Sequence, residues 1–301
     1  MKTILLAAIF VMPVSAQVCV DDAKVIAPIL SDAARKTHSE NLDIALANYT
    51  AKPGANSVIW LARRQGYLGQ YKEAVRTIST NLSRFQEDAR MYRHRGHRYI
   101  TLRCFDDAIR DFEAAAKLIR GKPDEVEPDG LPNAKNIPTS TLQSNIWYHL
   151  GLAYYLKGDF KAALRAYKEA QKVSKNNDMR VATSYWHYMT LRRMGKTKEA
   201  AKLLEQFAGD TEVIENTDYL KLIKLNRGEI KPEALLSEIQ GDAITLGSAS
   251  LGYGVGNYFL YNGDRSKASD IFRKIIAGNH WASFGYIAAE NDLARMATSQ
   301  K

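Results

Sequence analysis

The segment WYHLGLAYYLKGDFKAALRAYKEA, residues 147–170, decides the fold of this chain. Gly158 separates two stretches in which apolar residues recur at helical spacing. Gly151 in the first stretch and Ala163 in the second are small, so two helices can approach each other closely there. Large aromatic side chains in both stretches can fill the space between neighbouring helix pairs. The segment therefore predicts a helix-turn-helix unit.

The same unit recurs along the chain, and Ala74 and Ala108 stand 34 residues apart. That distance is the period of the tetratricopeptide repeat, a unit of two helices. Five units carry its consensus positions, and the unit quoted above carries them most completely, at Trp147, Leu150, Gly151, Tyr154, Gly158, Phe160, Ala163, Tyr167 and Ala170. The sequence predicts an all-α tetratricopeptide solenoid, a right-handed superhelix of stacked helix pairs with a concave and a convex face.

Length and composition agree with one helical domain. The chain has 301 residues, of which 46% are hydrophobic and 25% charged, so it is neither a disordered chain nor a multi-spanning membrane protein. We expect a signal peptide at 1–16 and a single domain at 17–301. Within that domain we expect capping helices at 17–55, two repeats at 56–119, a loop at 120–143, further repeats at 144–277 and a C-terminal capping helix at 278–301.

The first residues are typical of an export signal. Lys2 precedes an apolar run from Ile4 to Met12, and Val14-Ser15-Ala16 forms a small-residue cleavage site. The pattern predicts an exported protein, periplasmic or secreted. Cys19 lies two residues too late to carry a lipid, so no stable membrane anchor is expected. In an oxidising compartment Cys19 and Cys104 are candidates for a disulfide, and the alternative is a half-buried Cys104 with a free thiol at Cys19 on a loose N-terminus.

An insertion interrupts the regular spacing at residues 120–143. It holds four prolines, and acidic residues stand at 124, 125, 127 and 129. Proline cannot continue a helix, so this segment is predicted to be a loop that projects from the stack. A functional loop and a passive insertion remain alternatives at this point.

The candidate binding residues begin with a basic cluster in the second unit. The chain carries a net charge of +9, and six arginines lie between positions 84 and 103. In the geometry of tetratricopeptide repeats, Arg90, Arg93, His94 and His97 take the positions that face the concave groove. Guanidinium groups bind carboxylate or phosphate well, so the cluster favours an anionic ligand. Internal neutralisation, for instance by the acidic loop, is the alternative. Binding of an anion through His94 and His97 would strengthen as the pH falls through about 6.5, where free histidine becomes charged.

Aromatic residues take the equivalent groove positions in the next two units, at Tyr148, His149, Tyr185 and Trp186. Together with the basic cluster they suit an extended peptide or a sugar-containing ligand. The alternative is that they belong to the core. No metal or cofactor is predicted, because His94, His97 and His149 lack a carboxylate or cysteine to complete a site. Nucleic acid is not an expected partner, because the basic residues do not form a continuous track.

Two resemblances add to these expectations. The stretches RMYRHRGHRYI (90–100), VEPDGLPNA (126–134) and NIWYHLGLAYY (145–155) resemble a group of exported bacterial tetratricopeptide proteins without an assigned activity. The stretches GEIKPEALL (228–236) and NYFLYNGD (257–264) are distantly similar to the periplasmic adaptor lipoprotein family named new lipoprotein I. That resemblance implies a helical, non-catalytic and dimeric scaffold.

From the residues and the resemblances we predict a non-enzymatic interaction module that binds a peptide or a protein terminus in its concave groove, with a homodimer as one expected assembly. The alternative is a site for an anionic small molecule or a cell-wall glycan, with or without hydrolytic activity, between the Arg/His-rich helix and the loop at 120–143.

Overall fold

The structure is a computed structural model that describes residues 19, 25–238 and 246–298, so the predicted signal peptide lies outside the described residues. Within these ranges the regular secondary structure is helical, apart from one isolated antiparallel bridge between Val126 and Thr141. The helices are α1 (Asp32–Ala51), α2 (Ala55–Tyr67), α3 (Tyr71–Asn81), α4 (Ala89–Thr101), α5 (Phe105–Leu118), α6 (Leu142–Lys157), α7 (Phe160–Val173), α8 (Asn177–Arg193), α9 (Thr197–Leu204), α10 (Thr217–Asn226), α11 (Pro232–Glu238), α12 (Leu246–Tyr261), α13 (Arg265–Ala277) and α14 (Phe284–Thr298). Short 3-10 turns follow α3 at Leu82–Arg84 and α9 at Glu205–Phe207.

The unit that decides the fold forms the helix pair α6 and α7. The hydroxyl of Thr141 accepts a hydrogen bond from the backbone of Ser144 and begins α6, as expected for a threonine N-cap. Gly158 ends that helix in the left-handed region at φ 95°, which glycine adopts without steric cost. A Cβ atom added at Gly151 would lie 2.7 Å from the ring of Tyr167 on α7. Close packing of the two helices therefore depends on the glycine.

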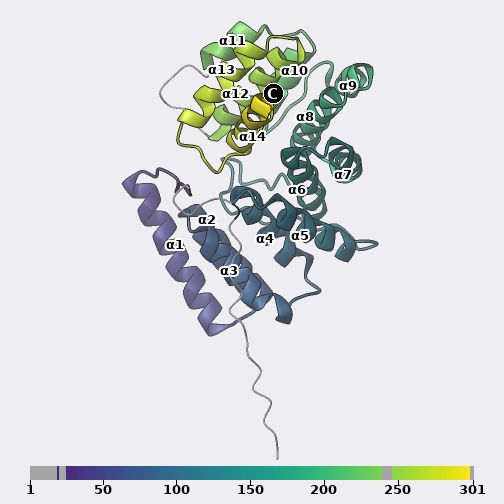
Figure 1. The fold of residues 1–301 in the computed structure, drawn as a ribbon. Helices are drawn as coiled ribbons and strands as arrows, with labels where there is room; N and C mark the ends of the chain where they lie inside the picture. The colour runs from purple at the N-terminus through teal and green to yellow at the C-terminus, as the bar shows by residue number, and fades with distance from the viewer. Residues whose placement is uncertain (1–18, 20–24, 239–245, 299–301) are drawn as a thin grey trace, which may run out of the picture.

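The other helices form pairs in the same way. The pairs α2–α3, α4–α5, α8–α9 and α12–α13 each pack along their length, and consecutive pairs stack on one another. In Figure 1 the stack runs from α2 through the teal helices α4 to α9. The prediction of an all-helical solenoid with tetratricopeptide units is confirmed. Between α9 and α12 lies a further, shorter pair, α10 and α11, and Pro232 is the first residue of α11.

The C-terminal helices fold back toward the first half of the chain. In Figure 1 the green and yellow helices α10 to α14 return over α8 instead of extending the row. Helix α14 packs against α6 as well as against α12 and α13. Asp292 on α14 is 1% exposed, accepts a hydrogen bond from the hydroxyl of Tyr253, and forms ion pairs with Arg193 on α8 and Arg295.

The predicted capping segment at 278–301 contains the helix α14, which does more than close the end of the stack. It also joins the last helices to the middle of the solenoid. Near the N-terminus, the described part of 17–55 contains one helix, α1, where capping helices in the plural were predicted.

Candidate functional site

The basic cluster of α4 meets the acidic loop on the concave face. Arg93 Nε lies 3.0 Å from a carboxylate oxygen of Glu127, and His94 Nε2 lies 3.3 Å from the other oxygen. Glu127 comes from the loop at 120–143 and is only 6% exposed. The amide of Asn145, at the start of α6, donates a third contact to this carboxylate at 3.0 Å. The anion that these cationic residues were predicted to bind is therefore present within the chain.

Helix α2 holds the next residues of the same loop. Arg63 donates a hydrogen bond of 2.8 Å to the carbonyl of Pro128, and Arg64 donates one of 3.1 Å to the carbonyl of Gly130. A Cβ atom at Gly130 would overlap the hydroxyl of Tyr67, so the loop backbone passes close to the side chains of α2 at this point. The loop at 120–143 therefore lies across the concave face, although the sequence predicted a projecting loop.

Two neighbouring arginines of α4, Arg90 and Arg95, have carboxylate partners of their own. Arg90 pairs with Asp88, which also caps α4. Arg95 forms two hydrogen bonds of 2.7 Å with Asp111 on α5, so helix α5 neutralises it and the acidic loop does not. Of the four predicted groove residues of α4, Arg93 and His94 contact the loop, Arg90 is half-buried beside Asp88, and His97 is half-buried against His149 and Phe284.

Beneath the loop lies a small cavity of about 140 Å³. Helices α2, α3 and α4 contribute its walls. Its lining combines three arginines and two histidines with one tyrosine and two apolar residues, namely Arg63, Arg93, Arg98, His94, His97, Tyr67, Ala62 and Ile78.

Burial keeps the histidines of this region neutral. Loss of solvation lowers the pKa of His94 and of His97 well below the usual 6.5, and neighbouring arginines lower it further. Burial also lowers the pKa of His149 to about 3. The expectation that His94 and His97 become charged near pH 6.5 is therefore wrong for the folded protein, because burial and the neighbouring arginines disfavour their cations.

The predicted aromatic row belongs to the core. Tyr148, His149, Tyr185 and Trp186 are all less than 7% exposed, so they do not line an open groove. Trp186 donates a hydrogen bond to Tyr219, and its ring packs against Tyr155 and Tyr253. The reason for Tyr185 and Trp186 is the return of α10 and α12: α10 packs on α8, and Tyr253 of α12 stacks on Trp186. The position of a residue within its repeat does not show whether helices from later in the chain cover that residue.

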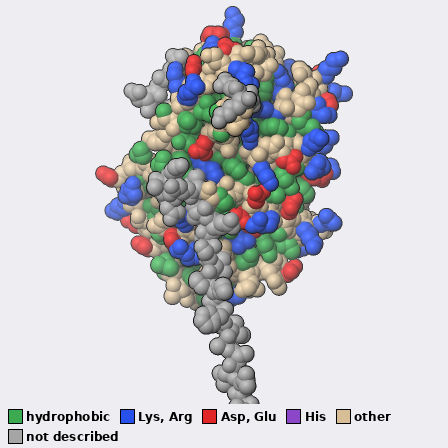
Figure 2. Space-filling model, viewed as in Figure 1, with side chains coloured by type: hydrophobic (Ala, Val, Ile, Leu, Met, Phe, Trp, Pro, Cys, Tyr) green, Lys and Arg blue, Asp and Glu red, His purple; other side chains and the backbone are tan. Residues whose placement is uncertain are grey.

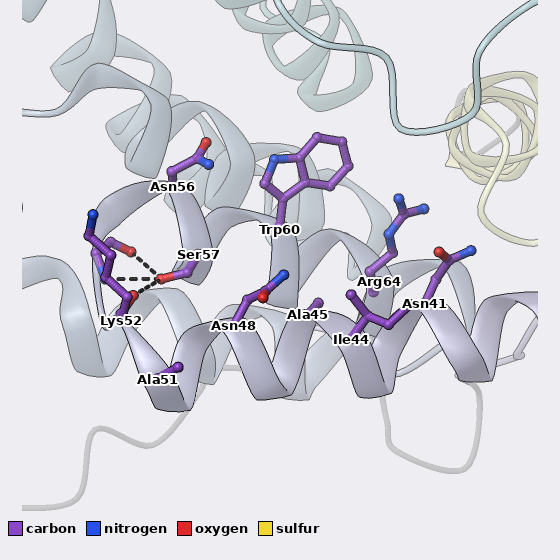
Figure 3. Close-up of a pocket in the computed structure, with 11 residues that line it drawn as sticks. Asn41, Ile44, Ala45, Asn48, Ala51, Lys52, Asn56, Ser57, Trp60 and Arg64 are labelled. Atoms are coloured by element: carbon purple, nitrogen blue, oxygen red, sulfur yellow. Dashed lines mark hydrogen bonds between the residues drawn. The ribbon is translucent and has the colours of Figure 1, made fainter.

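An open groove does exist between α1 and α2, with a volume of about 480 Å³. Figure 3 shows Trp60 and Arg64 projecting from α2 while α1 forms the opposite wall. The guanidinium carbons of Arg63 and Arg64 lie 4.5 and 5.0 Å from the centre of the Trp60 ring. The side-chain amides of three asparagines line the groove, from Asn41, Asn48 and Asn56. The sequence did not predict this groove, because its second wall is α1, which lies outside the predicted repeats.

Positive charge also covers a second surface. Figure 2 shows Lys and Arg side chains along the edge of the molecule that carries α7 and α9 in Figure 1. Arg165 and Lys168 on α7 and Lys198 and Lys202 on α9 are exposed. The excess of basic residues is therefore not confined to α4.

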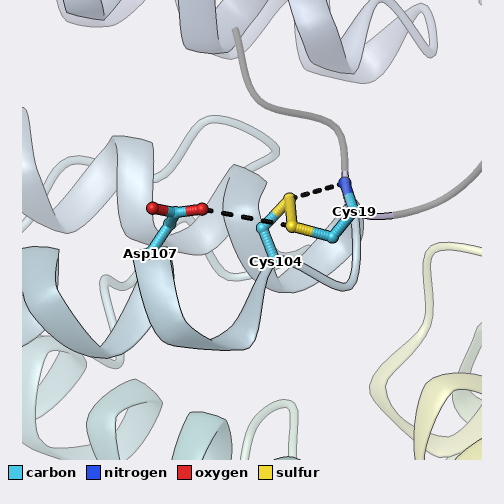
Figure 4. Close-up of side chains that lie close together, drawn as sticks. All are labelled: Cys19, Cys104 and Asp107. Carbon is cyan, nitrogen blue, oxygen red and sulfur yellow. Dashed lines mark hydrogen bonds between the residues drawn. A yellow bond between two sulfur atoms is a disulfide. The ribbon is translucent and has the colours of Figure 1, made fainter.

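The two cysteines lie together at the start of α5. The sulfur atoms of Cys19 and Cys104 form a disulfide, and their Cα atoms are 4.9 Å apart. Figure 4 shows the carboxylate of Asp107 beside this bond. A metal site from these three residues would need the two sulfurs as free thiolates, so the disulfide and a metal site exclude each other.

Comparison with known proteins identifies the type of repeat. Residues 144–177 match the family model of the tetratricopeptide repeat. With the stacked helix pairs, this match defines the class as an all-helical solenoid containing tetratricopeptide units. No curated protein matches the chain. In the described residues no helix has both the length and the apolar character needed to cross a membrane.

Several solved structures are similar in fold. The crystal structure of YrrB, described as a TPR protein with an unusual peptide-binding site, is 17% identical, covers 89% of this chain and 98% of its own, and has a TM-score of 0.41. Naa15/Naa10 bound to HypK-THB is 16% identical over 85% of this chain and 37% of its own, with a TM-score of 0.39. The APC/C hetero-tetramer Cut9-Hcn1 is 15% identical over 88% and 62%, with a TM-score of 0.38.

Proposed function

We propose that this protein is a non-catalytic interaction module that binds an extended segment of a partner protein in the groove between α1 and α2. Solenoids of helix pairs present long surfaces suited to such segments. Asn56, Trp60 and Arg63 follow one another at helical spacing, so they share one face of α2. Arg63 on that face already holds the loop, and the groove lies beside it.

The observation that carries the proposal is the way the chain binds its own loop. Carbonyl groups of the loop accept hydrogen bonds from Arg63 and Arg64, and the carboxylate of Glu127 is bound by Arg93 and His94. Contacts of these two kinds recognise an extended chain with an acidic side chain. In the open groove, the face of Trp60 offers an apolar contact and the asparagine amides offer partners for a peptide backbone.

Affinity capture followed by mass spectrometry tests this function. Trp60→Ala combined with Asn48→Ala should abolish capture of the partner, because both side chains face the groove and neither is buried. Arg84→Ala, an exposed change outside the groove, is the matched control and should retain it. Equal capture by the wild type, the double variant and Arg84→Ala, with unchanged melting temperatures, would exclude the groove as the binding surface.

We further propose that the protein is exported into an oxidising compartment, the periplasm or the exterior. The sequence of residues 1–16 and the Cys19–Cys104 disulfide support this. Protein isolated from its native compartment should react with a thiol-alkylating reagent only after reduction. Alkylation of both cysteines without reduction would contradict the proposal.

The predicted homodimer is a separate proposal, which light scattering of the purified chain tests.

A further inference from the structure

The cavity beneath the loop carries more positive charge than its surroundings neutralise. Three guanidinium groups line it, from Arg63, Arg93 and Arg98, and arginine stays protonated in proteins. The carboxylate of Glu127 pairs with Arg93. Arg63 donates to a backbone carbonyl, and Arg98 contacts the imidazole of His97. Within the described ranges neither Arg63 nor Arg98 forms an ion pair with a carboxylate.

These positive charges lie in a poorly solvated place. The side chain of Arg93 is 11% exposed, and its buried Nε–H makes no hydrogen bond although it lies close to Glu127. Burial lowers the pKa of Arg98 to about 10, and repulsion from Arg93 and Arg63 adds to the effect. Buried charge without a counter-charge is costly, so a bound anion would stabilise this cluster.

The size and cover of the cavity restrict the ligand. Its 140 Å³ exceeds the roughly 30 Å³ that one water molecule occupies in the liquid several-fold, so a small ion fits. The loop residues Glu127 to Gly130 are bound across the same face by Arg63, Arg64 and Arg93, so a polypeptide would first have to displace them. A small ion that diffuses freely faces no such requirement.

We propose that this cavity binds a small inorganic oxyanion, phosphate or sulfate, through Arg98 and Arg93. Guanidinium forks match the geometry of such oxyanions, so the two arginines supply the donors. This site is separate from the groove between α1 and α2, and neither proposal depends on the other.

Thermal unfolding of the whole mature chain, with ionic strength held constant by sodium chloride, tests the site. Phosphate or sulfate should raise Tm by at least about 3 °C at saturation, whereas chloride alone should not. Arg98→Met should remove this response and should melt in chloride at or above the temperature of the wild type, because it removes an uncompensated charge. Arg165→Met, an exposed arginine on α7, is the control and should respond as the wild type does.

Three outcomes would overturn the proposal. The first is a wild type that responds to neither oxyanion, a result that decides the question even if Arg98→Met does not fold. The second is an equal loss of response in Arg165→Met, which would show binding to the general surface. The third is a response to O-phosphoserine without one to phosphate or sulfate, which would assign the site to a phosphoryl group on a larger partner.

Discussion

Glu127 is the residue on which the arrangement of the concave face depends. Its carboxylate is buried between Arg93, His94 and Asn145, which belong to two different helices. Glu127→Gln keeps the shape of the side chain and removes its charge. We expect it to lower the free energy of unfolding by about 3–5 kcal/mol, because it leaves the buried Arg93 without a counter-charge. Urea unfolding in chloride buffer measures the change.

Asp106→Asn is the matched control for that prediction. Asp106 pairs with Lys157, and both side chains are at least half exposed. Solvent screens such a pair, so its loss should cost no more than about 1 kcal/mol. Equal effects of the two substitutions would show that Glu127 contributes no more than a surface carboxylate.

His149 makes stability depend on pH. Its Nδ1–H donates a hydrogen bond of 2.6 Å to the carbonyl of Asn145, and burial lowers its pKa to about 3. The unfolded chain, with a pKa near 6.5, therefore takes up a proton at a pH where the folded protein does not. This contribution to stability is complete above about pH 6.5 and is lost as the pH falls toward about 3, at up to about 1.4 kcal/mol per pH unit.

Urea unfolding between pH 7 and pH 4 checks this dependence. His149→Gln should lower stability at pH 7 through lost packing, and it should also reduce the slope with pH by about one proton. An unchanged slope in the variant would mean that His149 is not the group that titrates on unfolding.

At the scale of elements, glycines set the spacing of the helix pairs. A Cβ atom would lie 2.7 Å from Tyr167 at Gly151, and 3.0 Å from Phe112 at Gly96. Alanine normally favours a helix by about 1 kcal/mol over glycine. We expect Gly151→Ala to destabilise by about 1–3 kcal/mol nevertheless, because the aromatic ring must move. Gly96→Ala should cost less, and chemical denaturation ranks the two. A stabilised Gly151→Ala would contradict close packing of α6 on α7.

The elements themselves were largely predictable from the sequence. The consensus positions and Gly158 predicted α6, α7 and the turn between them. These signals are local, because caps and small residues act within one turn or one pair of helices. The path of the loop at 120–143 was not predictable, because it depends on residues of α2 that lie more than sixty positions away.

At the scale of the whole molecule, Asp292 joins the returning C-terminal helices to the solenoid. We expect Asp292→Asn to lower the free energy of unfolding by about 3–5 kcal/mol, because Arg193 lies at a site with little access to water. Hydrogen exchange should become faster in α14 before it does in α4 and α5. Asp270→Asn, which breaks an exposed pair on α13, is the control and should leave both measurements nearly unchanged.

The sequence alone determined the fold class, the helix pairs and the basic character of α4. Periodic apolar residues, small residues and helix caps direct the structure over short distances along the chain, and arginine binds a carboxylate wherever the two meet. Only the tertiary structure decided which carboxylate that is, and which groove stays open. Glu127 and the returning helices α10 to α14 cover surfaces that an isolated repeat would expose to solvent. Burial of apolar surface favours this arrangement once distant segments of the chain meet. Trp60 remains in the open groove because no later segment covers the space between α1 and α2 in the described chain.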